Sequence, residues 1–271
     1  MDEPFDRDRF GVVSGALLLA MALARLLDVS GRPLEVMALG SPLGITLSET
    51  TLMLLIIAGL AVTGVESLVR THPRARRGEL DRSLMFWIVP ALLCVGLVAW
   101  LNGVEDLGLW TLGLLVATFL VPLALLAEYM AVSPDVRRSG WLIWGQMLLV
   151  HLVALLLFTT IYGARLRGLL AGPAVLLATT LLAARLFWIV CSNVRLAFLY
   201  GAVAGLVLGQ LVWVLNYWRL SSQRGGLLLL LFFYVVVGLL QQFLHGRFGR
   251  RVVLEYGGIA LLVLAAIFLM A

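Results

Sequence analysis

The sequence predicts an all-α fold: a polytopic bundle of eight or nine transmembrane helices with a small extracytoplasmic hairpin or loop near residues 31–50. Of the 271 residues, 62% are hydrophobic and 13% are charged, whereas soluble domains average about 45–50% and about 25%. The apolar residues fall in long runs, and about 20 such residues suffice for a helix to cross the roughly 30 Å hydrocarbon layer. No polar stretch is long enough for a soluble domain, so we expect residues 1–271 to form a single transmembrane domain.

The first apolar run covers about residues 10–27. The tail before it, MDEPFDRDR, holds four acids and two arginines, whereas a signal peptide begins with a net positive charge. We therefore expect a retained first helix. The letters MALAR near its end resemble a cleavage site, which leaves a cleaved signal as the alternative.

The segment GRPLEVMALGSPLGITLSETT, residues 31–51, is too polar and too interrupted by glycine and proline to span a membrane. Two short runs flank GSP, so the pattern favours a small hairpin or an interfacial loop. The remaining apolar runs predict spans over about 51–68, 84–101, 109–130, 141–162, 173–191, 196–217, 227–244 and 252–270. Tryptophans near several of these ends match the aromatic belt of membrane proteins.

All twenty basic residues are arginine. Without lysine there is no lysine Schiff base and no P-loop lysine. Cys94 and Cys191 lie in apolar runs without a CxxC motif, which indicates small buried side chains. HExxH and acidic diphosphate-binding motifs are missing too, so we expect no cofactor and no metal. The net charge of +5 comes mainly from short loops and does not indicate nucleic acid.

The arginines also predict the orientation. If the N-terminus defines one side, thirteen arginines lie on that side, six lie on the other, and Arg185 lies within a span. Arginine-rich loops stay in the cytoplasm. We therefore predict a cytoplasmic N-terminus and an external C-terminus. An arginine-only chain rich in alanine, leucine and glycine suggests a bacterial inner-membrane protein.

Three glycines recur every fourth residue in YGAVAGLVLG, at Gly201, Gly205 and Gly209. In water, a glycine inside a helix costs about 1 kcal/mol relative to alanine, but in lipid it permits close helix packing. Asn216 falls on the same stripe and is expected to hydrogen-bond across it. The stripe predicts packing against a helix of the same chain, or alternatively a homodimer seam or a contact with another membrane subunit.

Charged side chains within membrane spans are costly, so each is a candidate functional residue. Arg185 lies roughly 9 Å inside its span, and we expect it to have a carboxylate partner. Glu66, Glu128 and Glu255 lie at compatible depths. The grouping is explained either by an ion pair that holds the bundle or by a polar cavity open to the cytoplasm.

The motif ESLVRTHP places Glu66 and Arg70 four residues apart, which predicts an ion pair on one helix face. Pro73 is expected to end that helix, leaving His72 solvated in the basic loop. His151 falls in the middle of its span, where a hydrogen-bonded core histidine and a proton relay are the two interpretations.

The stretches FWIVPALL, AEYM, RLAFLYGAVAGLVLGQLVWVLNYW and GLLLLLFFYVVVGLLQQFL resemble an uncharacterised family of bacterial multi-pass membrane proteins. The resemblance covers nearly the whole chain and implies no activity.

These observations predict an integral membrane protein that acts as a non-catalytic subunit or scaffold and binds partner helices or lipid. The alternative is a transporter or flippase for a lipid-like or small anionic substrate, with a cytoplasm-facing polar cavity around Arg185. An intramembrane transferase without a familiar motif is a third option.

Overall fold

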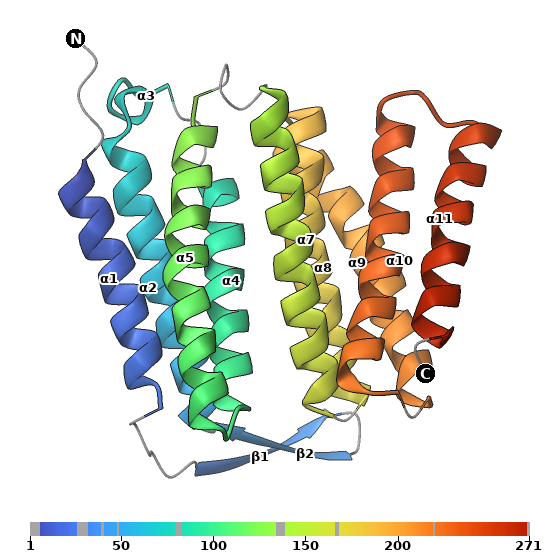
Figure 1. The fold of residues 1–271 in the computed structure, drawn as a ribbon, viewed down its shortest axis with the longest axis horizontal. Helices are drawn as coiled ribbons and strands as arrows, with labels where there is room; N and C mark the ends of the chain where they lie inside the picture. The colour runs from blue at the N-terminus through green and yellow to red at the C-terminus, as the bar shows by residue number, and fades with distance from the viewer. Residues whose placement is uncertain are drawn as a thin grey trace. The chain divides into compact units, whose positions relative to one another are not determined.

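A computed structural model of the chain describes residues 6–25, 32–38, 41–47, 49–79, 83–133, 139–165, 168–218 and 220–269 (Figure 1). Within these ranges the chain forms ten helices and one hairpin, which confirms the predicted all-α class. The chain divides into two compact units, Met1–Leu142 and Ile143–Ala271. Each unit is described separately, and the single domain over 1–271 stays a prediction.

The first unit contains five helices: α1 (Arg7–Leu23), α2 (Glu49–Thr71), α3 (Pro73–Arg76), α4 (Leu84–Asn102) and α5 (Leu107–Ala131). Helix α4 packs against both α2 and α5, and α1 packs against the same two helices, α2 and α5. Side-chain caps fix two of the starts, because Asp6 accepts from the Arg9 amide and Asp106 from the Leu109 amide. Such caps satisfy amide groups that a helix leaves without intrahelical partners.

A stripe of buried residues on α2 forms part of this core. Ile57, Ala61 and Val65 recur every four residues and are at most 2% exposed, as expected for one helix face. On α1, Leu17 and Met21 are likewise buried, so the first apolar run packs into the unit. Residues 26–27, the end of that predicted run, lie outside the described residues.

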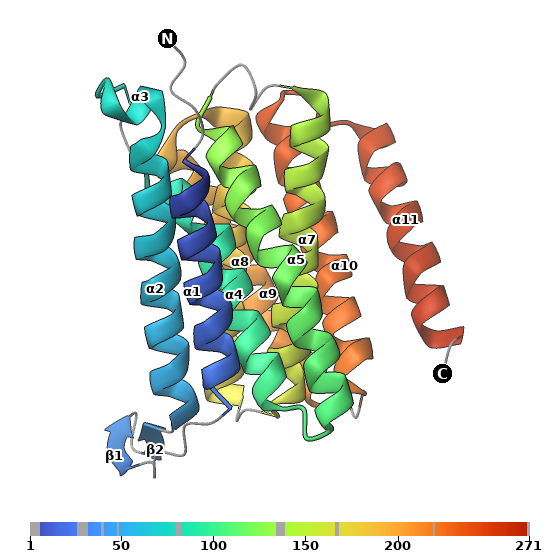
Figure 2. The same ribbon diagram turned by 60° about the vertical axis from the view of Figure 1, so that its left-hand side comes forward.

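A two-stranded antiparallel hairpin lies between α1 and α2 in sequence. Strand β1 (Arg32–Ala38) pairs with β2 (Ser41–Leu47), with Arg32 opposite Leu47 and Ala38 opposite Ser41. The hairpin contacts α2 through β2, and it lies at the end of α2 opposite to α3 (Figure 2). Of the two predicted alternatives for this segment, hairpin or loop, the structure has the hairpin.

The second unit contains α7 (Gly140–Gly163), α8 (Gly168–Cys191), α9 (Val194–Asn216), α10 (Ser222–Leu244) and α11 (Arg250–Leu269). Helices α8 and α9 form the most extensive helix pair, and α10 contacts α8, α9 and α11. The Tyr162 hydroxyl at the end of α7 donates to the carbonyls of Leu215 and Trp218, at distances of 2.9 and 3.0 Å. That contact joins α7 to the C-terminal end of α9.

Seven helices in the described ranges are long and apolar enough to cross a membrane: α2, α4, α5, α7, α8, α9 and α10. The chain is therefore a multi-pass membrane protein. The predicted runs at the two ends are also helical, but α1 has 17 residues and α11 opens with two arginines and carries Glu255. The described helices thus support seven candidate spans, fewer than the eight or nine predicted.

Candidate functional site

Polar side chains gather in the first unit where α2 ends and α3 begins. We call this group the α2–α5 polar cluster; it comprises Glu66, Arg70, Thr71, His72, Arg74, Ser83, Trp87, Tyr129 and Ser133. Helix α2 ends at Thr71 and α3 begins at Pro73, as predicted from the proline. Two of its residues, Thr71 and His72, are each only 8% exposed, so the cluster reaches into the packed end of the unit.

Glu66 is the acceptor at one side of the cluster. Its Oε1 accepts from Arg70 Nε at 2.8 Å, and its Oε2 accepts from Trp87 Nε1 at 2.9 Å. The Ser83 hydroxyl is a third donor. The predicted pair of Glu66 with Arg70 is therefore present. Because donors occupy both oxygens, this carboxylate suits a structural anchor between α2 and α4 better than a proton acceptor for a substrate.

His72 caps helix α3. Its Nδ1 accepts from the Arg74 backbone amide at 3.3 Å, and its Nε2 lies 3.2 Å from Ser133 Oγ. An acceptor Nδ1 requires the tautomer with hydrogen on Nε2, which then donates to Ser133. The prediction that His72 is solvated is wrong. It is buried because the residues after α2 turn back against the end of α5, where the Tyr129 ring stands edge-on at 5.1 Å.

The charge environment of His72 favours its neutral form. Burial lowers the pKa of His72 below its ordinary value of 6.5, and the Arg74 guanidinium lowers it further. Both effects disfavour adding a positive charge to the ring.

Arg74 ties α3 to its surroundings. Its Nε donates to Glu79 Oε2 at 2.9 Å, and its Nη1 lies 3.5 Å from the Val132 carbonyl oxygen. Tyr129 is hydrogen-bonded to Thr71. The cluster therefore joins the end of α2, the short α3 and the end of α5 through several polar contacts.

Arg185 lies in the second unit and is buried, with 1% of its surface exposed. Its guanidinium carbon lies 5.2 Å from the centroid of the Trp188 ring, within the range of a cation–π contact. Of the three predicted carboxylate partners, Glu66 is bound to Arg70 and Trp87, and Glu255 is exposed on α11. Glu128 is 1% exposed on α5, and its pairing with Arg185 stays a prediction.

His151 is half-buried in the second unit. Its Nδ1 lies 2.7 Å from the Met147 carbonyl oxygen one turn earlier in α7. The ring stands edge-on to Phe233 and Tyr234 of α10, at 5.5 and 6.1 Å between centroids. The hydrogen bond and the ring contacts are local to α7 and α10, and the choice between a core histidine and a proton relay stays open.

Helix α8 occupies the glycine stripe of α9. A β-carbon on Gly201 would lie 2.6 Å from the Thr180 carbonyl oxygen, one on Gly205 2.7 Å from that of Leu176, and one on Gly209 3.1 Å from that of Gly172. The distances at Gly201 and Gly205 leave no room for a side chain, and at Gly209 the neighbouring backbone would have to shift by a few tenths of an ångström. A helix from another subunit would therefore need another face of the protein.

Asn216 does not continue this contact. The structure has it exposed at the last position of α9, and the expected hydrogen bond across the stripe stays a prediction. The antiparallel register explains this, because Gly209 faces Gly172 and α8 begins at Gly168, which leaves Asn216 beyond the end of its neighbour.

Sequence reasoning missed most partners in the polar cluster. Ser83, Ser133 and the Trp87 indole nitrogen meet Glu66 or His72 from other helices, and only the depth of Trp87 near a span end hinted at a polar contact. Among the described residues, no three His, Cys, Asp or Glu side chains are grouped to hold a metal ion. The arrangement can fix helices and neutralise charge within them.

A family model described as "Protein of unknown function (DUF5656)" matches residues 29–270. The match confirms the predicted resemblance to an uncharacterised family. No curated protein and no solved structure matches the chain.

Proposed function

The chain belongs to the DUF5656 family, whose function is unknown, and from that premise we propose that it is a non-catalytic membrane subunit or scaffold that binds partner helices and lipid. In this proposal residues 1–271 form one transmembrane domain of eight or nine spans in the inner membrane of a bacterium. The N-terminus lies in the cytoplasm and the C-terminus outside.

The observation that carries the proposal is that both carboxylate oxygens of Glu66 accept hydrogen bonds from the protein itself. Arg70, Trp87 and Ser83 all donate to this carboxylate from within the same unit. A catalytic carboxylate needs an oxygen within hydrogen-bond reach of the group it deprotonates. Donors that already occupy both oxygens favour a structural role, as expected for polar groups that hold membrane helices together.

Broad apolar faces support the binding part of the proposal. Phe119 on α5, Trp144 on α7 and Leu262 on α11 are 76%, 73% and 74% exposed. In a membrane such faces contact acyl chains or the helices of other proteins. A scaffold uses a defined subset of its faces for a protein partner.

Site-specific photocrosslinking in native membranes tests this proposal. A photoreactive amino acid is placed singly at Phe119, Trp144 or Leu262, three positions of nearly equal exposure. We expect a protein adduct of fixed mass at one or two of these positions and lipid adducts alone at the rest. Each position serves as the exposure-matched control for the others. Lipid adducts alone at all three positions would contradict the subunit role.

Burial of Arg185 favours a second candidate, the transporter or flippase for a lipid-like or small anionic substrate. An arginine with 1% exposure inside a candidate span is a common feature of substrate pathways. Reconstituted vesicles with a fluorescent phospholipid decide between the two. If the protein is a transporter, the fluorescent phospholipid should cross the bilayer, and Arg185→Ala should abolish that movement. If it is a scaffold, the phospholipid should cross no faster than in protein-free vesicles.

A further inference from the structure

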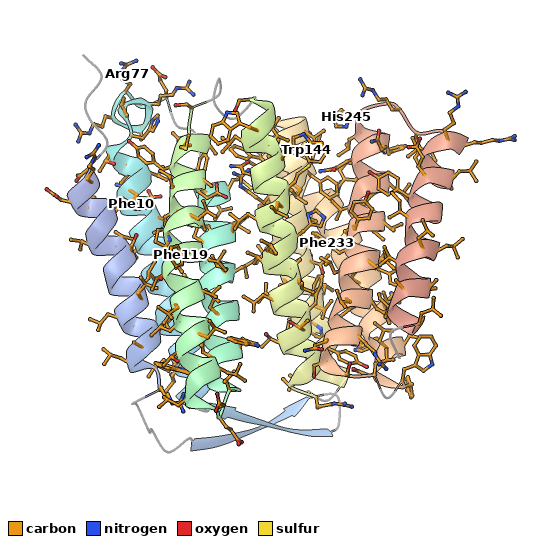
Figure 3. All side chains as sticks on the ribbon, in the orientation of Figure 1. Phe10, Arg77, Phe119, Trp144, Phe233 and His245 are labelled. Atoms are coloured by element: carbon orange, nitrogen blue, oxygen red, sulfur yellow. The ribbon has the colours of Figure 1, made fainter. Side chains whose placement is uncertain are left out.

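The turn between α10 and α11 carries an isolated group of positive charges. We call residues 241–251 the basic turn; it includes His245, Arg247, Arg250 and Arg251, and Figure 3 shows His245 at this end of α10. Because α10 is a candidate span that ends at Leu244, the basic turn lies at the membrane boundary.

The three arginines of the basic turn are exposed. In the described ranges no ion pair involves them, unlike Arg9, Arg70 and Arg74 of the first unit, which each pair with an acid. Two of the three stand in the first turn of α11, where the helix dipole disfavours cations. Their placement therefore does not serve the stability of that helix.

Two phenylalanines lie among these residues, one on each side of Arg247 in the sequence. Phe243 and Phe248 are each 56% exposed, and their rings meet edge-on with centroids 6.3 Å apart. The backbone between them is fixed, because Gly246 adopts a φ of 68° and its amide donates to the Phe243 carbonyl, while the Arg247 amide donates to that of Gln242. An ordered turn loses less entropy when it binds a ligand.

Gln241 adds an unused donor at the same turn. Its side-chain Nε2 is buried and finds no hydrogen-bond partner among the described residues. A buried donor without a partner is costly, and this donor lies within the last turn of α10, next to the exposed arginines in sequence.

We propose that the basic turn binds the phosphate group of an anionic phospholipid. Arginine guanidinium groups match phosphate oxygens in geometry and charge, and exposed aromatic rings at the membrane boundary suit the region where headgroup meets acyl chain. This inference rests on the proposed function only in that the turn must lie at a lipid surface. It specifies anionic phospholipid as the lipid class that the scaffold would bind.

Lipid titration of the purified full chain in detergent, followed by native mass spectrometry, tests the proposal. The probes are phosphatidylglycerol and phosphatidylcholine with identical acyl chains. We expect phosphatidylglycerol to bind about a hundredfold more tightly, as three arginines near a membrane surface allow. The variant R247Q/R250Q/R251Q should lose that preference, whereas R247K/R250K/R251K should keep part of it.

The matched control removes the same charge elsewhere. Arg7, Arg77 and Arg195 are exposed arginines outside the basic turn, and R7Q/R77Q/R195Q should keep the preference within about threefold if the turn holds the lipid. Thermal unfolding in detergent shows whether each variant is folded.

Three results would overturn the proposal: no preference in the unaltered protein, equal loss in both glutamine variants, or inorganic phosphate binding as tightly as the lipid. If photocrosslinking in membranes gives no protein adduct, the scaffold role is contradicted. The lipid titration does not depend on that result.

Discussion

At the residue scale, His72 is the titratable group whose state the structure defines most clearly. Its Nδ1 accepts the Arg74 amide, and a protonated ring has no acceptor nitrogen. Protonation would thus break the cap of α3 and place a second positive charge beside Arg74. Tyr129 of α5 and Ser133 just after that helix, which contact the ring, carry no negative charge to compensate.

The stability of the first unit should therefore fall on mild acidification. The pKa of His72 is lowered in the folded state, so the folded protein binds fewer protons than the unfolded chain. The contribution of His72 to the free energy of unfolding is fully present above its unfolded-state pKa of about 6.5. That contribution is lost as the pH falls through the lower folded-state pKa. Thermal unfolding in detergent between about pH 7.5 and pH 5.5, where carboxylates stay ionised, measures the effect.

The variant His72→Asn is the control for this prediction. Asparagine is a good helix cap and does not titrate, so the variant should hold α3 and lose the pH dependence over that interval. The same acid sensitivity in His72→Asn as in the unaltered protein would show that another group causes it.

Residues close in sequence were predictable here, and residues from different helices were not. The pair Glu66–Arg70 follows from helical spacing alone, and the helix end before Pro73 follows from proline geometry. The burial of His72 depends on Ser133 and Tyr129, sixty-one and fifty-seven positions later. Local patterns carry no signal for such contacts, which is why the solvated interpretation failed.

At the element scale, the α8–α9 pair shows how glycine spacing determines packing. Gly201, Gly205 and Gly209 oppose the carbonyls of Thr180, Leu176 and Gly172 in antiparallel register. The spacing of four on each helix keeps the two backbones in close approach over two turns. The glycine spacing predicted that another helix approaches α9 closely. Only the structure identifies that helix as α8.

Alanine at Gly205 should destabilise the protein. Its β-carbon would lie 2.7 Å from the Leu176 carbonyl oxygen, and overpacking of this kind typically costs about 1–3 kcal/mol. Gly257 on α11 has nothing within 4 Å of an added β-carbon, so Gly257→Ala should be neutral or stabilise by up to about 1 kcal/mol. Unfolding free energies in detergent compare the two, and an equal effect at both sites would contradict the tight-seam account.

Helix bounds were the most predictable feature. The predicted span 84–101 corresponds to Leu84–Asn102, and 196–217 to Val194–Asn216, because long apolar runs end where polar residues and caps begin. The predicted span 173–191 begins five residues after the observed start of α8 at Gly168, and Pro173 lies inside the helix.

At the scale of the whole molecule, composition alone identified a multi-pass membrane protein, and the seven candidate spans agree with it. The count of nine rests further on α1 and α11, a short helix and one that begins with arginines. Orientation rests on the arginine distribution, which includes Arg82, Arg137, Arg138, Arg167 and Arg219 outside the described residues. The proposed orientation puts the α3 segment and the basic turn on the same, cytoplasmic side.

Cysteine accessibility tests that central claim most directly. In a background without Cys94 and Cys191, single cysteines replace Arg77, Arg247, Glu105 or Ala164, all exposed residues. Intact spheroplasts are treated with a membrane-impermeant maleimide, before and after lysis. The account predicts labelling at 105 and 164 in intact spheroplasts, and labelling at 77 and 247 only after lysis. Labelling of position 247 together with 105 before lysis would contradict it.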